Sequence, residues 1–275
     1  MRAGFAVAAG RLAALDYQPA RPAAATAVLV PGYTGSKEDF LPLLRPLAAR
    51  GVRAVAIDQR GQFESSWATE PEGYLVDRLA ADVLCVVASL GDGPVHLVGH
   101  SFGGLVARAA AVAGPDRFAS VTLLGSGPAA IGGRRRLVID ASEPVLREQG
   151  LERLWDYLAD ASRADPKYVD SPPAVLAFLR KRFLANDPAG LLVMGDELRR
   201  ERDRSDALAR TGLPLLVLHG VDDDAWPPAV QADMAHRLAA RYRVVTRSAH
   251  SPAVENPAGT LQELLSFFDA AEPTA

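Results

Sequence analysis

The stretch GHSFG at residues 99–103 places Ser101 in a pattern that suits nucleophilic catalysis. A strand-like run, VHLVG (95–99), precedes the serine, and a helix-like run, LVARAAAVA (105–113), follows it. Glycines on both sides of the serine allow the sharp turn between strand and helix that such a site requires. On this turn the hydroxyl is held exposed above a sheet, so Ser101 is the predicted nucleophile.

A serine hydroxyl is a weak nucleophile near neutral pH and needs a general base beside it. Of the five histidines in the chain, His250 alone lies in a predicted loop after the last strand, within SAHSP (248–252). Loops at the carboxyl ends of strands are where an open α/β sheet forms its site. His250 is therefore the predicted base. The other histidines lie in or at the end of strands, before the serine, or in a helix: His96, His219, His100 and His236.

The base in turn needs a carboxylate that fixes its tautomer and stabilises its positive charge. The run HGVDDDAWPP (219–228) follows the strand-like PLLVL and offers Asp222, Asp223 and Asp224. The resulting order Ser…Asp…His is one of the known chain orders of this triad. From the residues alone all three aspartates stay open as the acid, and at least one is expected to be solvated or to cap the helix near Pro227.

An acyl-transfer reaction also needs two N–H donors for the developing oxyanion, and losing one donor costs roughly 3–4 kcal/mol of transition-state stabilisation. The amide of Phe102, next to the nucleophile, is one predicted donor. The second is expected from the loop PGYTGS (31–36), where Gly32 permits close approach of the backbone and Tyr33 supplies the amide. This chemistry implies no metal and no organic cofactor.

The elements that must position these residues follow from alternating strand-like and helix-like segments. Short runs that are apolar on both parities predict strands covered on both faces, at 27–30, 52–57, 95–99, 120–125 and 214–220, with a more polar one at 242–246 near the sheet edge. A leading hairpin is expected at 4–8 and 11–17, and helices at 40–50, 75–90, 105–113, 230–240 and 260–270. This alternation predicts an α/β fold with a mostly parallel central sheet and helices on both faces.

The alternation stops between residues 128 and 206, where no strand-like run occurs and apolar residues recur at helical spacing. We expect a helical cap insertion at 128–206 over the carboxyl edge of the sheet, with residues 1–127 and 207–275 forming the core. A separately folding domain is the alternative. Its arginine clusters are expected to be solvated surface rather than an anion site. Its large apolar side chains could line an acyl pocket but are expected to be core: Trp155, Phe178, Phe183, Leu191 and Met194.

The whole chain has an ordinary globular balance, with 275 residues, 49% hydrophobic and 23% charged. A net charge of −3 gives no sign of a nucleic-acid or membrane-surface partner, so a small-molecule substrate is expected, and the oligomeric state stays open. No apolar run approaches the roughly 18 residues that span a bilayer. The apolar stretch after Arg2 is short for a signal peptide, so we expect a cytoplasmic protein. The single cysteine, Cys85, is expected to be a small buried residue of a helix.

Taken together, these residues resemble the α/β-hydrolase superfamily over most of the chain. GHSFGG (99–104) is similar to its nucleophile elbow, and PGYTGS to its oxyanion loop, which supports Tyr33. The resemblance to G-x-x-D-x-x-x-P at 220–227 selects Asp223 over its neighbours. AHSPAVENP (249–257) resembles the ending around the family's histidine and supports His250. DQRGQFES (58–65) resembles the family's D-x-R-G-x-G-x-S turn, and the insertion resembles its cap.

Three positions depart from the family pattern: Pro31 replaces the histidine of an H-G pair, Phe63 replaces a glycine, and Ala249 replaces the glycine before the histidine. None removes a catalytic group. The resemblance implies a serine hydrolase that cleaves an ester-like bond through an acyl-enzyme. Alternatives on the same triad are C–C bond hydrolysis, lactone opening, thioester cleavage and cofactor-free peroxidase activity. A non-catalytic binding protein that reuses the fold is a further alternative. Serine at 101 argues against the aspartate-using dehalogenase and epoxide hydrolase branches.

Overall fold

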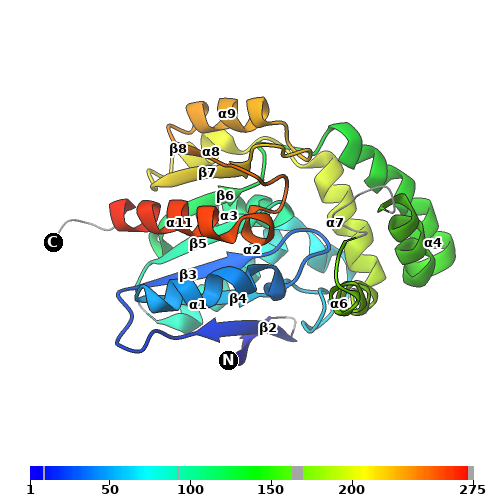
Figure 1. Cartoon of the computed structure of the whole chain (residues 1–275), viewed down its shortest axis with the longest axis horizontal. Coiled ribbons are helices and arrows are strands. Elements are labelled where there is room, and N and C mark those ends of the chain that lie inside the picture. Colours follow the sequence, from blue (N-terminus) through cyan, green and yellow to red (C-terminus); the bar gives the residue numbers. More distant parts are fainter. Residues whose placement is uncertain (9, 92, 163–169, 272–275) are drawn as a thin grey trace.

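The computed structural model describes residues 1–8, 10–91, 93–162 and 170–271, which surround an eight-stranded sheet (Figure 1). The strand order is β1-β2-β4-β3-β5-β6-β7-β8. Strands β3 to β8 are parallel to one another, and the hairpin β1–β2 joins β4 antiparallel, which confirms the mostly parallel sheet. The bounds are β1 (Arg2–Val7), β2 (Gly10–Tyr17), β3 (Ala25–Val30), β4 (Val52–Ile57), β5 (Val95–His100), β6 (Phe118–Leu124), β7 (Leu215–Gly220) and β8 (Arg241–Val245).

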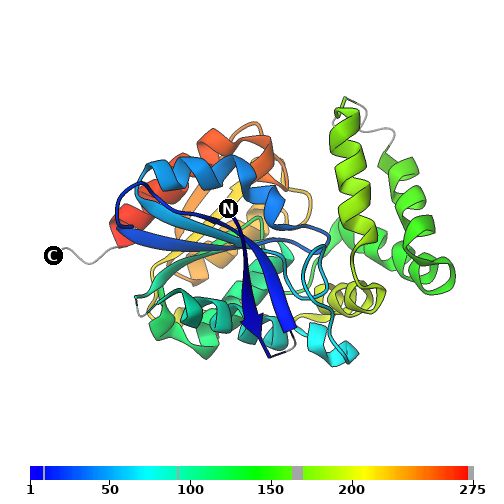
Figure 2. The ribbon, with the colours of Figure 1, turned by 90° about the horizontal axis from the view of Figure 1, so that it is seen from below.

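Helices cover both faces of this sheet (Figure 2). Successive residues of β3 point to opposite faces, and Ala27 to Val30 are all fully buried, because each face has its own apolar cluster. This double burial is why the strand runs are apolar on both parities. One face carries α1 (Leu41–Ala49) and α11 (Pro257–Ala271), and the other carries α2 (Val76–Leu90), α3 (Phe102–Ala113), α8 (Ser205–Ala209) and α9 (Pro228–Arg237).

Helix α2 shows why the expected burial of Cys85 is wrong. The helix buries one stripe, which includes Leu79, Val83, Val86 and Val87. Cys85 lies on the other side of the helix and is exposed. In an amphipathic helix, the side of the helix on which a residue falls decides whether it is buried. Apolar neighbours in sequence therefore do not make a cysteine a core residue.

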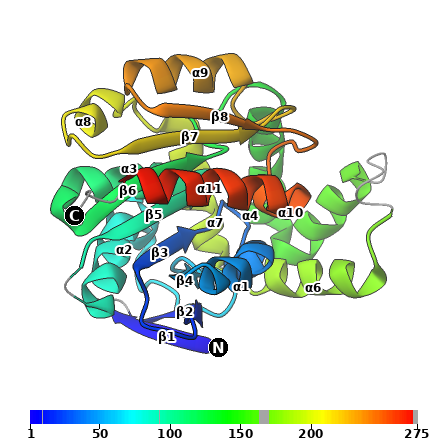
Figure 3. The same cartoon turned by 60° about the vertical axis from the view of Figure 1, so that its left-hand side comes forward.

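Between β6 and β7 the described chain is helical and contains no strand. Figures 1 and 3 show α4, α6 and α7 gathered at one end of the sheet, the end toward which the arrows of β3 and β7 point. Phe183 and Leu191 pack with α4 in a small apolar cluster, and Met194 joins the main core, as expected for core residues. The bounds are α4 (Gly133–Ser162), which breaks at Gly150 where φ is 78°, α6 (Pro173–Leu184) and α7 (Pro188–Arg200).

This helical segment leaves and rejoins the rest of the chain at one place, which we call the neck. There, the backbone N–H of Ala130 donates to the carbonyl of Glu201 at 2.9 Å. The buried guanidinium of Arg108, on α3, donates to the carbonyl of Pro128 and, at 2.9 Å, to the carboxylate of Glu201. One arginine therefore ties both ends of the segment to the helix that follows Ser101.

None of the helices in the described ranges combines the length and the apolar composition needed to cross a membrane.

Candidate active site

Ser101 lies in the turn between β5 and α3, with φ 54° and ψ −119°. Residues other than glycine rarely adopt such a conformation, and holding one there costs about 1–3 kcal/mol. The glycines of the motif make the turn possible. A Cβ on Gly99 would come within 2.3 Å of the Gly103 carbonyl oxygen, and a Cβ on Gly103 within 2.4 Å of that of Val30. Helix α3 therefore starts at Phe102, three residues before the predicted start, and Ser101 stands at the carboxyl end of its strand.

The structure brings Ser101, His250 and Asp223 together. The Ser101 Oγ lies 2.9 Å from Nε2 of His250, and Nδ1 of His250 lies 3.0 Å from Oδ1 of Asp223. All three side chains are buried. Because the carboxylate can only accept, Nδ1 carries the proton and Nε2 is free to accept from the serine hydroxyl. This is the geometry that an activated serine requires.

Asp223 is the aspartate that reaches His250, and its neighbours lie elsewhere. Asp224 pairs with Arg135 of α4 at 2.8 Å, and Asp222 is exposed. Burial opposes the charge on Asp223, but His250 and the N–H donors of Ala225 and Gln231, each at 2.9 Å, outweigh it and hold the pKa of this carboxyl below its usual value. Asp223 is therefore an ionised acceptor at neutral pH.

Two further side chains hold the backbone around His250. His100 donates its Nε2–H to the His250 carbonyl at 2.7 Å, and burial, together with the nearby His250, lowers the pKa of His100 to about 4. A neutral His100 thus keeps one fixed N–H. Glu255 accepts from the backbone N–H groups of Ala249 at 2.5 Å and Ser251 at 3.3 Å. The glutamate of the AHSPAVENP stretch was a signal for this role, whereas no pattern pointed to His100.

Of the two predicted oxyanion donors, Phe102 follows the serine directly, and the loop that carries Tyr33 packs against the serine. Phe102 is the first residue of α3, so its N–H has no partner within the helix. Gly32 lies directly against Ser101, since a Cβ on Gly32 would stand 3.2 Å from the serine Cβ. Within the described ranges neither the Phe102 N–H nor the Tyr33 N–H has an acceptor in the protein. An amide without an acceptor in the protein is what an oxyanion donor requires before a substrate binds.

Two glutamines that the sequence reading did not single out hold the oxyanion loop. Gln59 donates to the carbonyl of Pro31 at 2.8 Å, and Gln62 donates to that of Gly32 at 2.7 Å. The Gly32 carbonyl and the Tyr33 N–H belong to one planar trans peptide, so they point in opposite directions. Gln62 thereby turns the Tyr33 N–H away from itself. These bonds show how the loop is held where Pro31 replaces the family's histidine.

The same turn carries Phe63, at a position where the family has glycine. Its φ is 40°, which lies in the region that favours glycine. The ring is 4.7 Å from the Nζ of Lys37 and forms an edge-to-face contact with Phe178 of α6 at 5.8 Å. Lys37 is buried and pairs with Asp58 at 2.7 Å. The strained backbone of Phe63 thus places an aromatic ring between the sheet and the helical segment.

No group of three or more histidine, cysteine, aspartate or glutamate side chains suited to a metal ion occurs in the described part of the chain.

Comparisons with known proteins agree with this architecture. The sequence matches the profile of the "Alpha/beta hydrolase family" over residues 27–263. A non-heme haloperoxidase from Rhodococcus erythropolis is 31% identical over 253 residues, which cover 87% of this chain and 90% of that protein.

Two solved structures share the fold. The enol-lactonase from Burkholderia xenovorans LB400 superposes with a TM-score of 0.82 at 24% identity, covering 97% of this chain and 100% of that one. A thermophilic esterase from Thermogutta terrifontis superposes with a TM-score of 0.80 at 21% identity, covering 99% and 100%. With the profile match spanning most of the sequence, the chain belongs to the alpha/beta hydrolase family, as its motifs predicted.

Proposed function

We propose that the protein is a serine hydrolase that cleaves an ester-like bond of a small molecule through an acyl-enzyme intermediate. The observation that carries this proposal is the continuous hydrogen-bond chain from Ser101 through His250 to Asp223. It lies at the carboxyl ends of parallel strands, where open α/β sheets form their sites. The esterase and enol-lactonase that share the fold support a carboxylic ester or its cyclic form as the bond.

The proposed reaction follows from these groups. Ser101 Oγ attacks the carbonyl carbon while its proton passes to Nε2 of His250, and Asp223 stabilises the resulting imidazolium. The amides of Tyr33 and Phe102 hold the oxyanion. His250 then gives the proton to the leaving oxygen, and the ester bond breaks. In the second half, His250 takes a proton from water while the water oxygen attacks the acyl carbon. His250 then gives this proton to Oγ of Ser101 as the bond between the acyl carbon and Oγ breaks, which releases the acid.

We assign the segment 128–206 to a cap that covers this site. Its helices α4, α6 and α7 lie at the end of the sheet that carries Ser101. Arg135 of α4 pairs with Asp224, the residue after Asp223, and the Leu191 carbonyl of α7 accepts from Tyr33 of the oxyanion loop. Substrate selection is therefore expected to depend on residues of this segment.

The relative named as a non-heme haloperoxidase favours a second candidate activity. In it, hydrogen peroxide replaces water as the attacking group on the acyl-enzyme, and a peracid forms in place of the acid. Adding hydrogen peroxide to the ester assay and measuring peracid separates the two outcomes, because both depend on Ser101 but only one yields peracid.

The test of the main proposal is Ser101→Ala with p-nitrophenyl acetate and a fluorophosphonate probe. Loss of the nucleophile should lower kcat by at least about 10⁴-fold and abolish labelling by the probe. Ser89→Ala, at an exposed serine of α2, is the matched control and should behave like the wild type. Wild-type turnover in Ser101→Ala would refute the assignment.

A further inference from the structure

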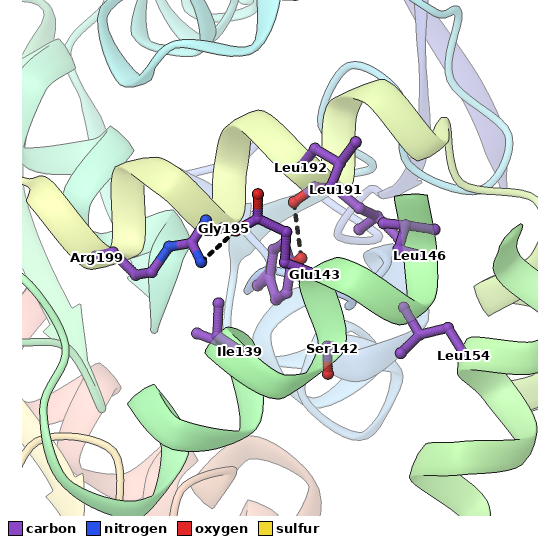
Figure 4. Close-up of a pocket in the computed structure, with 10 residues that line it drawn as sticks. Ile139, Ser142, Glu143, Leu146, Leu154, Leu191, Leu192, Gly195 and Arg199 are labelled. Carbon is purple, nitrogen blue, oxygen red and sulfur yellow. Dashed lines mark hydrogen bonds and ion pairs between the residues drawn. The ribbon is translucent and has the colours of Figure 1, made fainter. Parts of the chain in front are cut away.

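The side chain of Tyr33 leaves the oxyanion loop and enters the helical segment. Its hydroxyl donates to the carbonyl oxygen of Leu191, on α7, at 2.7 Å. Figure 4 shows this site, a small hollow between α4 and α7 that Tyr33 lines together with Ile139, Leu146 and Leu154. Burial raises the pKa of Tyr33 above its ordinary value, so the hydroxyl is protonated and remains a donor at neutral pH.

Gly195, one turn further along α7, makes room for the tip of this ring. A Cβ at Gly195 would lie 3.2 Å from the Tyr33 hydroxyl oxygen and 3.7 Å from the ring carbon that carries it. The first of these distances is tighter than an ordinary contact, so the phenol would have to move by a few tenths of an ångström. Glycine weakens the interior of a helix. Glycine at position 195 therefore has a packing reason, because it leaves the space that the Tyr33 hydroxyl occupies.

A second contact ties the same loop to α6. Arg182 forms an ion pair with the carboxylate of Asp39 and donates to the Ser36 hydroxyl at 3.3 Å. The other carboxylate oxygen of Asp39 accepts from the Ser36 N–H at 3.2 Å. Residues 33–39 are thus held by two helices of the segment, at positions well beyond them in the sequence.

We propose that α7, through the hydroxyl of Tyr33, positions the Tyr33 amide in the oxyanion hole. Gln62 holds the carbonyl side of the Gly32–Tyr33 peptide, and α7 holds the side chain of the same residue. The two contacts fix the amide from both sides. The inference rests on the proposed function, because it assigns to the Tyr33 hydroxyl a positioning role within that hydrolase. The helical segment then contributes to catalysis in both halves of the reaction and does not only enclose the substrate.

The first variant is Tyr33→Phe, which keeps the ring and the amide and removes the bond to Leu191. A small displacement of the Tyr33 amide reduces the stabilisation of the transition state more than the binding of the substrate. We therefore expect kcat to fall roughly 10-fold while KM stays within about twofold. The affinity for a trifluoromethyl ketone, which forms a tetrahedral adduct with Ser101, should fall by the same factor as kcat, because that adduct uses the same oxyanion donors.

The second variant, Gly195→Ala, separates positioning from stability. Alanine favours the helix but displaces the Tyr33 hydroxyl. We therefore expect a lower kcat and weaker ketone binding without a lower melting temperature. Ser142→Ala changes another residue that lines the same hollow, makes no bond to Tyr33, and should leave kcat unchanged.

Fluorophosphonate titration of the active serine normalises every rate and separates the possible failures. Labelled Tyr33→Phe and Gly195→Ala enzymes with kcat and ketone affinity within twofold of the wild type would overturn the positioning role alone. Lower melting temperatures with unchanged kcat per titrated serine would do the same, since they would show a merely structural contact. A wild-type protein that is not labelled at Ser101 would overturn the proposed function and this inference with it.

Discussion

The sheet and the helical segment hold the candidate site in different ways. Ser101, Asp223 and His250 stand where the backbone leaves β5, β7 and β8. Apolar burial on both faces fixes β5 and β7, and pairing with β7 holds the edge strand β8. The helical segment contacts the site through polar groups: the Leu191 carbonyl accepts from the Tyr33 hydroxyl, and Arg182 pairs with Asp39. The three proposed catalytic residues are thus placed by the architecture of the sheet, while we propose that the Tyr33 amide depends on polar contacts between remote parts of the chain.

The largest expected effect tests the sheet side of this comparison. Asp223→Asn should lower kcat by about 10⁴-fold, because a neutral amide no longer fixes the tautomer of His250 or stabilises its charge. Asp222→Asn and Asp224→Asn, measured in the same ester assay, should each change kcat by less than about threefold. An equal loss in Asp224→Asn would break the comparison, because the partner of Asp224 is Arg135 of the helical segment.

The second prediction tests the neck between the two regions. Arg108→Met should lower the free energy of unfolding by about 3 kcal/mol, because the Glu201 carboxylate loses a buried partner. The double variant Arg108→Met/Glu201→Leu should recover a large part of this loss, since it removes both charges. Urea denaturation measures both. A single variant within about 0.5 kcal/mol of the wild type would show that the other contacts hold the neck without Arg108, namely the backbone bonds and the ion pair of Glu201 with Arg204 at 2.9 Å.

The smallest effect concerns the ring contact between the two regions. At Phe63, glycine should be more stable than alanine by about 1 kcal/mol, because the positive φ strains any side chain. At its partner Phe178, inside α6, the order should reverse by a similar amount of about 1 kcal/mol, because glycine weakens a helix. Urea unfolding of Phe63→Gly, Phe63→Ala, Phe178→Gly and Phe178→Ala measures these differences in the free energy of unfolding. The same order at both positions would contradict it.

The sequence predicted the parts of the fold that depend on short-range patterns. The run VRAVAI forms β4 at the predicted bounds. A strand that is buried on both faces needs apolar residues at both odd and even positions, which makes such a run visible in the sequence. The polar run near residue 242 became the edge strand β8, which pairs only with β7 among the described strands. The turn around Ser101 was readable because glycines, a strand and a helix must adjoin there. The prediction that Cys85 is buried is wrong, although the spacing of the apolar residues of α2 places Cys85 on the exposed side of the helix.

The remaining parts of the site depend on contacts that have no spacing rule. Tyr33 and Leu191 are separated by 158 residues, and nothing in either stretch marks the other as a partner. Gln62 acts by holding a carbonyl, a role that many glutamines could fill, so its residue type carried no signal. Even Asp223 could not be separated from its neighbours by residue type and was selected through the family's spacing.

The neck also has a consequence for how such proteins can diversify. Because Ala130 and Glu201 are bonded to each other, the chain between them leaves and returns through one narrow junction. A change in the length or sequence of that stretch does not alter the order of the strands in the sheet, on which the placement of Ser101 depends. We therefore expect that relatives can exchange this stretch as a unit and acquire a new binding surface beside the same three proposed catalytic residues. Such an exchange has to keep the contacts of the stretch with the rest of the chain, among them the bond from Tyr33 to Leu191 and the ion pair of Arg182 with Asp39.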